Sequence, residues 1–163
     1  MDKTLIIQPA SGLQYDWKAI AANPYDRHEP TMDLVAFKAL YINKIAQARA
    51  CGQEPVLVSL PIIDENRFFS HITRGMSLQE RKNVLYWLGG KTERLRNIHA
   101  LYNLALFRLA ALHCVHIIDV TSPMLAYADY DELLEPDGVT LSASGQAIVD
   151  AELTKIAKHE AAA

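Results

Sequence analysis

Three short apolar runs divide the chain, and each has the pattern of a buried strand. The runs cover residues 4–8, 55–61 and 115–120. Pro9 ends the first run, and prolines stand at both ends of the second. A continuous apolar run without polar alternation is typical of a strand that is covered on both faces in a parallel sheet. The pattern therefore predicts three buried parallel strands.

Between and after these runs, apolar residues recur at steps of three and four, which predicts helices with one buried face. Three of these segments cover residues 33–50, 77–88 and 92–113. A fourth helix follows Ser142, which can cap its start, and is expected to fray after Lys158. The helices thus fill the intervals between the strands and the end of the chain.

Helix boundaries and loops complete the predicted secondary structure. Ser77 and Glu80 have the spacing of a capping box, which marks the start of the second helix. Residues 9–32, 62–76 and 122–139 lack a regular period and are predicted as loops. A loop as long as 9–32 inside a compact domain is usually functional or a surface for a partner.

The order of these elements predicts the fold class. Strands alternate with helices, which is typical of a three-layer α/β/α fold with a short parallel sheet. In such sheets the functional residues gather at the carboxyl ends of the strands. Here those ends are residues 10–12, 61–63 and 119–121, and the loop at 135–142 should return to the same edge.

Composition narrows the class of protein further. The chain has 163 residues, a formal net charge of −3 and 50% hydrophobic residues, which fits a single domain over residues 1–163. A pI near 6.0 without a basic run argues against a nucleic-acid partner. No apolar stretch approaches the roughly 20 residues of a membrane span, and the acidic start is a poor signal peptide. Cys51 and Cys114 make no disulfide framework, and no glycine-rich phosphate loop follows a strand. We therefore expect a cytoplasmic protein that uses no cofactor and contacts neither nucleic acid nor membrane.

Three stretches of the chain resemble the second half of an SGNH (GDSL-type) hydrolase. EPVLVSLPII at 54–63 resembles the family's fourth strand, and residues 95–124 resemble its long helix and the next strand. EPDGVTLSASGQAIVDAEL at 135–153 resembles the closing motif, so the likeness covers residues 34–158. The resemblance implies an N-terminally truncated SGNH/flavodoxin-like fold, in which the first strand and its catalytic serine would lie before Met1. It also implies descent from an esterase or acylhydrolase.

At the matching positions, the residues that carry the family's reaction are missing. No Gly-Asp-Ser motif occurs in the chain. Residues 4–12 match the family's third strand, so Ala10 and Gly12 stand where the family has a glycine and the asparagine of the oxyanion hole. The closing motif keeps Asp137 but has Thr140 in place of the general-base histidine. A serine hydroxyl is a weak nucleophile without a base, and loss of one oxyanion donor typically lowers the rate by ~10²–10³. We therefore expect a degenerate SGNH-like domain without esterase activity that binds a small molecule or a protein.

Two alternatives stay open beside this interpretation. An active esterase with a relocated site would use Ser11 as nucleophile, Asp137, and a loop histidine, either His28 or His71. The simpler interpretation of Ser11 is a turn residue before Gly12. A purely structural module that forms homo-oligomers is the other alternative.

Aromatic residues gather in the first predicted loop and indicate a binding surface. Tyr15, Trp17 and Tyr25 lie close in sequence to several charged residues and to His28. Aromatic rings beside hydrogen-bonding groups suit a ligand pocket or an interface, although they could equally cover the core. Together with Thr140, at the position of the family's base, these three aromatic residues form the predicted binding set.

The sequence offers no convincing metal site. His113 ends a predicted helix and His116 lies in a strand, so their side chains need not converge on one ion. The acidic residues between 129 and 137 lack the regular spacing of calcium ligands. No metal is therefore predicted.

The predicted truncation has a consequence for assembly. If the family's first two strands are absent, the strand at 4–8 lies at the edge of the sheet. An exposed apolar edge strand favours aggregation, and a twofold dimer is the commonest closed arrangement. We expect a homodimer, or a higher oligomer, that buries this strand or the neighbouring helices.

Overall fold

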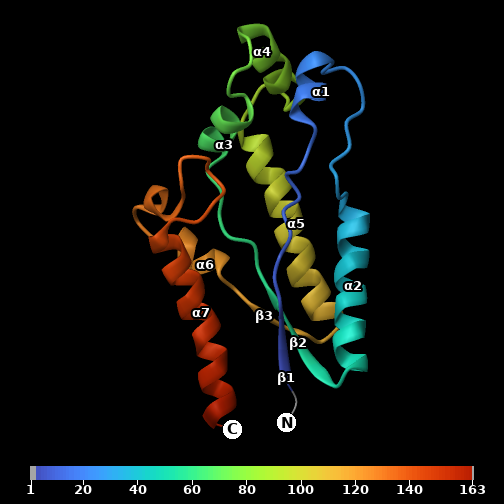
Figure 1. Cartoon of the computed structure of the whole chain (residues 1–163), viewed down its shortest axis with the longest axis vertical. Helices are drawn as coiled ribbons and strands as arrows, with labels where there is room; N and C mark the ends of the chain where they lie inside the picture. Colours follow the sequence, from blue (N-terminus) through green and yellow to red (C-terminus); the bar gives the residue numbers. More distant parts are fainter. Residues whose placement is uncertain (1–2, 163) are drawn as a thin grey trace.

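The computed structural model describes residues 3–162, which form a parallel sheet between layers of helices (Figure 1). The strands are β1 (Lys3–Ile7), β2 (Gln53–Val58) and β3 (His116–Ile118), hydrogen-bonded in the order β1-β2-β3. Both strand pairs are parallel. All three predicted strands are confirmed, with small shifts at their ends.

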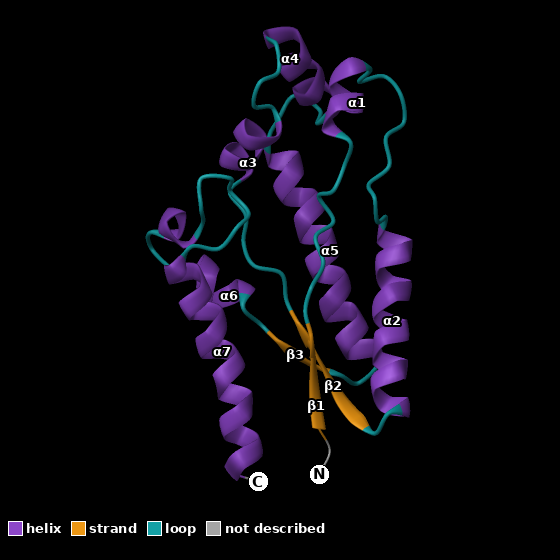
Figure 2. Cartoon of the chain, in the orientation of Figure 1, coloured by secondary structure: helices purple, strands orange, loops and turns teal. Residues whose placement is uncertain are grey.

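Helices cover both faces of this sheet (Figure 2). On one face lie α2 (Leu34–Ala50) and α5 (Glu93–Leu112), which share a core with the fully buried Leu57 of β2. On the other face lies α7 (Ala143–Ala162), whose Val149 packs against the valines of β2. Because side chains alternate along a strand, the continuous apolar run of β2 fills both cores. The predicted three-layer α/β/α fold is therefore confirmed.

The start and end of α4 (Leu78–Trp87) follow the sequence signals. The Ser77 hydroxyl accepts a hydrogen bond from the backbone N–H of Glu80 at 3.2 Å, and the Glu80 carboxylate accepts one from the Ser77 N–H at 2.7 Å. Gly89, just beyond the helix, has a φ of +78°, which favours glycine. The predicted capping box is confirmed.

The segments predicted as loops contain four short helices, and at these places the prediction is wrong. They are α1 (Trp17–Ala22), α3 (Glu65–Ile72), α6 (Thr121–Leu125) and the 3-10 helix η1 (Tyr130–Leu133). Helices of one or two turns show too little periodicity to be recognised. The side chains of Asp16 and Asp64 cap the starts of α1 and α3. The last helix, α7, also continues past Lys158 to Ala162. None of the helices in residues 3–162 is both long enough and apolar enough to cross a membrane.

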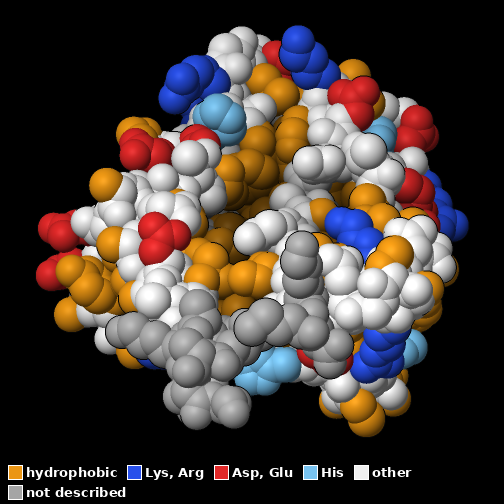
Figure 3. Space-filling view, turned by 60° about the horizontal axis from the view of Figure 1, so that its bottom comes forward, with side chains coloured by type: hydrophobic (Ala, Val, Ile, Leu, Met, Phe, Trp, Pro, Cys, Tyr) orange, Lys and Arg blue, Asp and Glu red, His pale blue; other side chains and the backbone are white. Residues whose placement is uncertain are grey.

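Within the described sheet, β1 is an edge strand. Two of its apolar side chains are partly open to solvent, Leu5 with 37% and Ile6 with 38% of its surface exposed. A groove of about 430 Å³ runs beside them and is also lined by Lys44 and Cys51 of the α2 side. Figure 3, which brings this end of the molecule forward, shows a hollow lined with hydrophobic side chains. The edge position expected for the first strand is confirmed.

Candidate functional site

At their carboxyl ends, β2 and β3 are joined by a network of buried and half-buried polar groups. The Ser59 hydroxyl, fully buried, accepts a hydrogen bond from the Val120 N–H at 2.9 Å. The Asn103 side chain accepts from the Leu60 N–H at 2.8 Å and donates to the Thr121 hydroxyl at 3.0 Å. Each group therefore has a structural partner. Sequence reasoning missed Ser59, whose one signal is a polar residue inside an apolar run.

The Asp137 loop (residues 135–142) returns to this edge of the sheet, as expected. It docks on the start of α3, because the Asp64 N–H donates to the Gly138 carbonyl at 2.9 Å. Gly138 has a φ of +76°, and a Cβ atom there would lie 2.5 Å from the Asp64 carbonyl oxygen. Only glycine fits such a close approach in this conformation. The loop is thus held at a fixed distance from α3.

Inside this loop, the Asp137 carboxylate is bound by its own neighbours. It accepts hydrogen bonds from the backbone N–H groups of Val139, at 3.0 Å, and of Thr140, at 2.8 Å. The Thr140 hydroxyl also donates to Asp137 at 2.5 Å. Thr140 therefore occupies the place that the resemblance gives to a histidine, and it satisfies the carboxylate that would orient this histidine.

The electrostatics of Asp137 follow from these contacts. Burial by itself raises the pKa of the carboxyl, but the hydrogen bonds from Thr140 and Val139 and the charge interaction with His71 outweigh it, so the pKa is lowered. Asp137 is therefore a carboxylate at neutral pH and can only accept hydrogen bonds. His71, one of the two loop histidines, is thus the one that interacts with Asp137.

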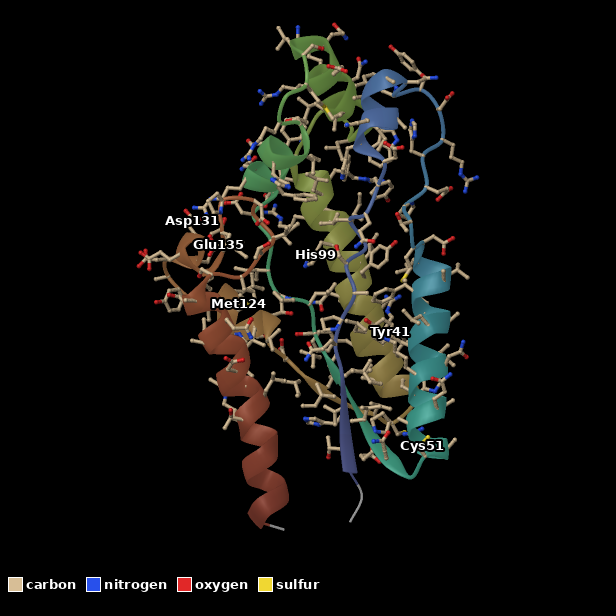
Figure 4. All side chains as sticks on the ribbon, in the orientation of Figure 1. Tyr41, Cys51, His99, Met124, Asp131 and Glu135 are labelled. Carbon is tan, nitrogen blue, oxygen red and sulfur yellow. The ribbon has the colours of Figure 1, made fainter. Side chains whose placement is uncertain are left out.

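The segment after β1 lies against Tyr41, which projects from α2 in Figure 4. Its hydroxyl accepts from the Ala10 N–H at 2.7 Å and donates to the Gln8 carbonyl at 3.1 Å. The next residue, Ser11, is exposed, and its hydroxyl accepts a hydrogen bond from the Leu13 N–H at 3.1 Å. Ser11 therefore makes the local contact of a turn residue.

Gly12 stands where the resemblance gives the oxyanion-hole asparagine. The space that a side chain at this position would need is occupied by the ring of Tyr102. A Cβ atom on Gly12 would lie 2.4 Å from two ring carbons of Tyr102. Tyr102 is held in this position because its hydroxyl donates to the Met32 carbonyl at 2.7 Å. An asparagine side chain at Gly12 would thus collide with a buried ring.

The three residues of the predicted relocated triad do not meet through hydrogen bonds. The Nε2 atom of His28 lies within hydrogen-bond distance of the Asn23 carbonyl oxygen, at 2.7 Å. The centroid of its ring lies 6.3 Å from that of Trp87. Within residues 3–162, no hydrogen bond joins the side chains of Ser11, His28 and Asp137. Their catalytic role stays a prediction.

His99 is a further histidine at this end of the molecule, and sequence reasoning missed it. It projects from α5 toward the segment that follows β2 (Figure 4), and its Nε2 atom lies 2.7 Å from the Pro61 carbonyl oxygen. Burial lowers the pKa of His99 more than this hydrogen bond raises it, so the ring is neutral at pH 7. Its Nδ1 atom is buried and has no hydrogen-bond partner among the described residues.

The aromatic residues predicted for binding fall into two groups. Tyr15 and Trp17 lie together, with ring centroids 5.3 Å apart, and Trp87 lies 5.1 Å from Tyr15. Tyr25 is 78% exposed and contacts Tyr86 instead. The fourth predicted residue, Thr140, belongs to the Asp137 loop. The structure therefore brings Tyr15 and Trp17 together and places the other two elsewhere.

Tyr15 and Trp87 contribute to a cavity of about 410 Å³, which we call the aromatic pocket. It lies between the segment that joins α1 to α2, the end of α4, and the first half of α5. Its lining residues are Tyr15, His28, Glu29, Pro30, Asp33, Leu34, Trp87, Arg94, Ile98, Leu101 and Tyr102. Of these residues, the sequence predicted Tyr15 for binding and placed His28 near it, and the other lining residues were not predicted.

Burial and acidic neighbours set the pKa values of the phenols in this pocket. Burial, together with the charges of Tyr15, Asp33 and Glu29, raises the pKa of Tyr102 to about 12. The pKa of Tyr15 is raised by burial and by Glu29, against the opposing charge of Arg94. Both phenols are therefore neutral hydrogen-bonding groups at pH 7, and the carboxylates dominate the local charge.

No metal centre is found in the described part of the chain. Residues 3–162 contain no group of three or more His, Cys, Asp or Glu side chains that could hold an ion. Asp131, in η1, and Glu135, in the Asp137 loop, are both exposed (Figure 4). Cys51 and Cys114 are both exposed, free thiols.

Three solved structures share the fold of this chain. A lipase/acylhydrolase from Enterococcus faecalis matches with a TM-score of 0.58 and 18% identity, over 97% of this chain and 62% of that one. A GDSL-like lipase from Bacteroides thetaiotaomicron gives a TM-score of 0.57 at 11% identity, over 96% and 62% of the two chains. A protein described as an SGNH hydrolase from Slackia heliotrinireducens gives 0.54 at 21% identity, over 94% and 64%.

These matches confirm the SGNH resemblance at the level of the fold. The identities are too low to carry more than the fold. The chain spans just under two thirds of the length of each of these proteins. No protein-family model and no curated protein matches the chain.

Proposed function

We propose that this chain is an SGNH-hydrolase-like domain that does not hydrolyse esters and instead binds a small molecule. The observation that carries the proposal is the 2.5 Å hydrogen bond from the Thr140 hydroxyl to Asp137. A threonine hydroxyl does not take a proton from a nucleophile near neutral pH, so the position that the resemblance gives to the histidine holds no base for Asp137 to orient. The hydrogen bond between Thr140 and Asp137 keeps the geometry of the loop, but it does not supply the proton transfer that the histidine performs in the family.

The position of Gly12 supports the same conclusion. An oxyanion hole needs a hydrogen-bond donor aimed at the developing charge, and loss of one such donor lowers the rate by about 10²–10³. Glycine has no side chain to donate, and the Tyr102 ring occupies the space that an asparagine would need. Two groups that the family's reaction requires are therefore replaced by groups with structural roles.

The aromatic pocket supports the binding part of the proposal. Ligand sites are usually concave, with apolar and aromatic walls and a few placed polar groups. The pocket combines the rings of Tyr15, Trp87 and Tyr102 with the charged side chains of Glu29 and Arg94. It is also separate from the Asp137 loop, so binding there does not depend on the hydrolase residues.

An ester-hydrolysis assay tests the loss of activity. We expect the purified chain to hydrolyse a short-chain p-nitrophenyl ester no faster than buffer. The variant Ser11→Ala is measured beside it. A rate above buffer that Ser11→Ala abolishes would contradict the proposal and favour a relocated esterase site. A rate above buffer that this variant leaves unchanged would contradict it as well, with a nucleophile other than Ser11.

A second candidate function, a structural homo-oligomeric module, is favoured by the exposed edge of β1. Leu5 and Ile6 are each more than one third exposed there. We propose that a second copy covers this edge. Light scattering at micromolar concentration should then give the mass of two chains, and Ile6→Lys should give the mass of one. Ile42→Lys, at an equally exposed isoleucine of α2, is the matched control. A single-chain mass for the unmodified protein would exclude this candidate.

A further inference from the structure

Aromatic rings form steeply angled walls in the aromatic pocket. The rings of Tyr15 and Trp87 lie 5.1 Å apart at an interplanar angle of 65°. His28 meets the same Trp87 ring at 79°. At these distances and angles the rings pack edge to face and form one angled wall of the pocket. The parts of the rings that line the cavity can present π-electron density to a ligand.

The charged groups of the pocket are mainly acidic. Glu29 and Asp33 contribute two carboxylates to its lining, and Arg94 contributes one guanidinium. Arg27 pairs with Glu29 but is 89% exposed and does not line the pocket. Asp33 also caps α2, where its side chain accepts a hydrogen bond from the Ala36 N–H at 2.8 Å. The lining therefore has a net negative charge.

The pKa values of the two tyrosines in the pocket also indicate a negative electrostatic potential. Burial is the largest cause of the raised pKa values of Tyr15 and Tyr102, and Glu29 raises both values further. Burial disfavours a charge of either sign, so only the contributions of the carboxylates, Glu29 at both tyrosines and Asp33 at Tyr102, indicate a potential that favours a cation. This agrees with the excess of carboxylates over guanidinium groups.

The lysine and arginine side chains of the described residues do not occupy the rings of the pocket. The cation–π contact in the structure joins Lys44 to Tyr41, which is outside the pocket. In residues 3–162, no lysine or arginine nitrogen lies over the rings of Tyr15, Trp87 or Tyr102. Within the described residues, no side-chain cation therefore competes with a ligand for the parts of these rings that line the pocket.

We infer that the aromatic pocket binds a small organic ammonium compound, held against the wall that Tyr15 and Trp87 form and near the carboxylates of Glu29 and Asp33. This inference rests on the proposed function, which treats the pocket as the binding site. A cation over aromatic faces gains attraction that an uncharged group of the same shape lacks. The volume of about 410 Å³ suits a small molecule. Arg94 adds a site for an anionic group on the same ligand.

The test compares two probes of the same shape that differ in charge. Binding of choline and of its uncharged isostere 3,3-dimethylbutan-1-ol to the purified chain is measured by titration calorimetry. We expect choline to bind about tenfold more tightly than the isostere, because a partly desolvated cation–π contact is worth about that ratio. Binding of choline should also weaken as salt is added, since part of the attraction is between charges.

Variants of the carboxylates locate the site. Glu29→Gln and Asp33→Asn each remove one negative charge, and asparagine still caps a helix well. We expect each to weaken choline binding by about threefold or more. Asp26→Asn, in the same segment but outside the lining, is the matched control and should leave binding unchanged.

Variants of the rings test the aromatic contribution. Tyr15→Leu removes a π face but keeps an apolar side chain, and we expect about a fivefold loss of choline affinity. Tyr25→Leu makes the same change at an exposed tyrosine outside the pocket and should have no effect. Circular dichroism checks that each variant is folded.

The outcomes separate the ligand class from the proposed function. Equal binding of both probes, or binding of choline that Glu29→Gln and Tyr15→Leu leave unchanged, would overturn the ammonium inference. Absence of choline binding up to about 10 mM, well above a millimolar Kd, would overturn it too. Neither result would restore ester hydrolysis, which the separate assay measures. If the isostere binds and Tyr15→Leu abolishes this binding, the pocket is a binding site and only the charge of its ligand is wrong.

Discussion

The Asp137 loop and the aromatic pocket differ in how their polar groups are used. In the loop, the Asp137 carboxylate accepts three hydrogen bonds from Val139 and Thr140, all within four residues. In the pocket, the carboxylates of Glu29 and Asp33 have one partner each in the chain and also line a cavity. The loop resembles the hydrolase family in sequence and is closed, whereas the pocket has no counterpart in that resemblance and is open. Satisfied polar groups stabilise a fold, and a ligand site keeps some of its groups for the ligand.

This difference predicts that changes in the loop alter stability and that changes in the pocket alter binding. The largest effect is expected at Gly138, where an added Cβ would lie 2.5 Å from the Asp64 carbonyl oxygen and 2.6 Å from the Phe68 nitrogen. We expect Gly138→Ala to lower the free energy of unfolding by about 3–4 kcal/mol, because conformational strain and overpacking add. Urea denaturation followed by circular dichroism measures this loss.

Gly75 provides the matched control for Gly138. Its φ is +77°, nearly the same as at Gly138, but an added Cβ would meet nothing within 4 Å. Gly75→Ala should therefore cost about 1 kcal/mol, the conformational part alone. If Gly138→Ala and Gly75→Ala lower the free energy of unfolding by the same amount, Gly138 is not in the close contact with α3 that the structure shows.

The next effect concerns Gly12 and the Tyr102 ring. We expect Gly12→Ala to lower the free energy of unfolding by about 2–3 kcal/mol, because its Cβ would lie 2.4 Å from the ring. In a chain that already carries Tyr102→Leu, Gly12→Ala should lower the free energy of unfolding by less than it does in the unmodified chain, since the smaller side chain relieves the clash. A double-mutant cycle in urea measures this coupling, and strictly additive losses would contradict the contact.

The pH dependence of stability tests the Asp137 carboxylate. Because its pKa is lower in the folded state than in the unfolded chain, its stabilising effect is complete above the unfolded value of about 3.9. The effect is then lost as the pH falls through the lowered folded value. Thr140→Val removes one of the hydrogen bonds and should cost about 1 kcal/mol at pH 7 and less at pH 2. An equal loss at both pH values would show that the hydroxyl matters for packing alone.

The sequence predicts the layers of this fold well because each layer has a strong local signal. The run that forms β2 is buried on both faces, and the capping box at Ser77 fixes the start of α4. The short α1 and α3 escaped prediction, since six and eight residues carry few periods. Local pattern therefore accounts for the sheet and the long helices.

The candidate site is less predictable because its contacts join distant residues. The substitution of Thr140 for a histidine is visible in the sequence, but the ring of Tyr102 over Gly12 is not. The aromatic pocket likewise needs Trp87 beside Tyr15, two residues whose contact depends on the packing of α4. A sequence names the side chains of such a pocket, and only the fold brings them together.

The smallest effect on stability is expected in the pocket, at Glu29. This carboxylate pairs with Arg27, and the two side chains are 54% and 89% exposed. An ion pair so open to solvent contributes little, so Glu29→Gln should change the free energy of unfolding by less than about 0.5 kcal/mol. The same variant is expected to weaken choline binding about threefold or more. Urea denaturation and calorimetry on one preparation of this variant measure both quantities. A loss of stability near that of Thr140→Val would place Glu29 with the Asp137 loop among the groups that hold the fold. A loss of binding without a loss of stability would place it among the groups that the fold keeps for a ligand.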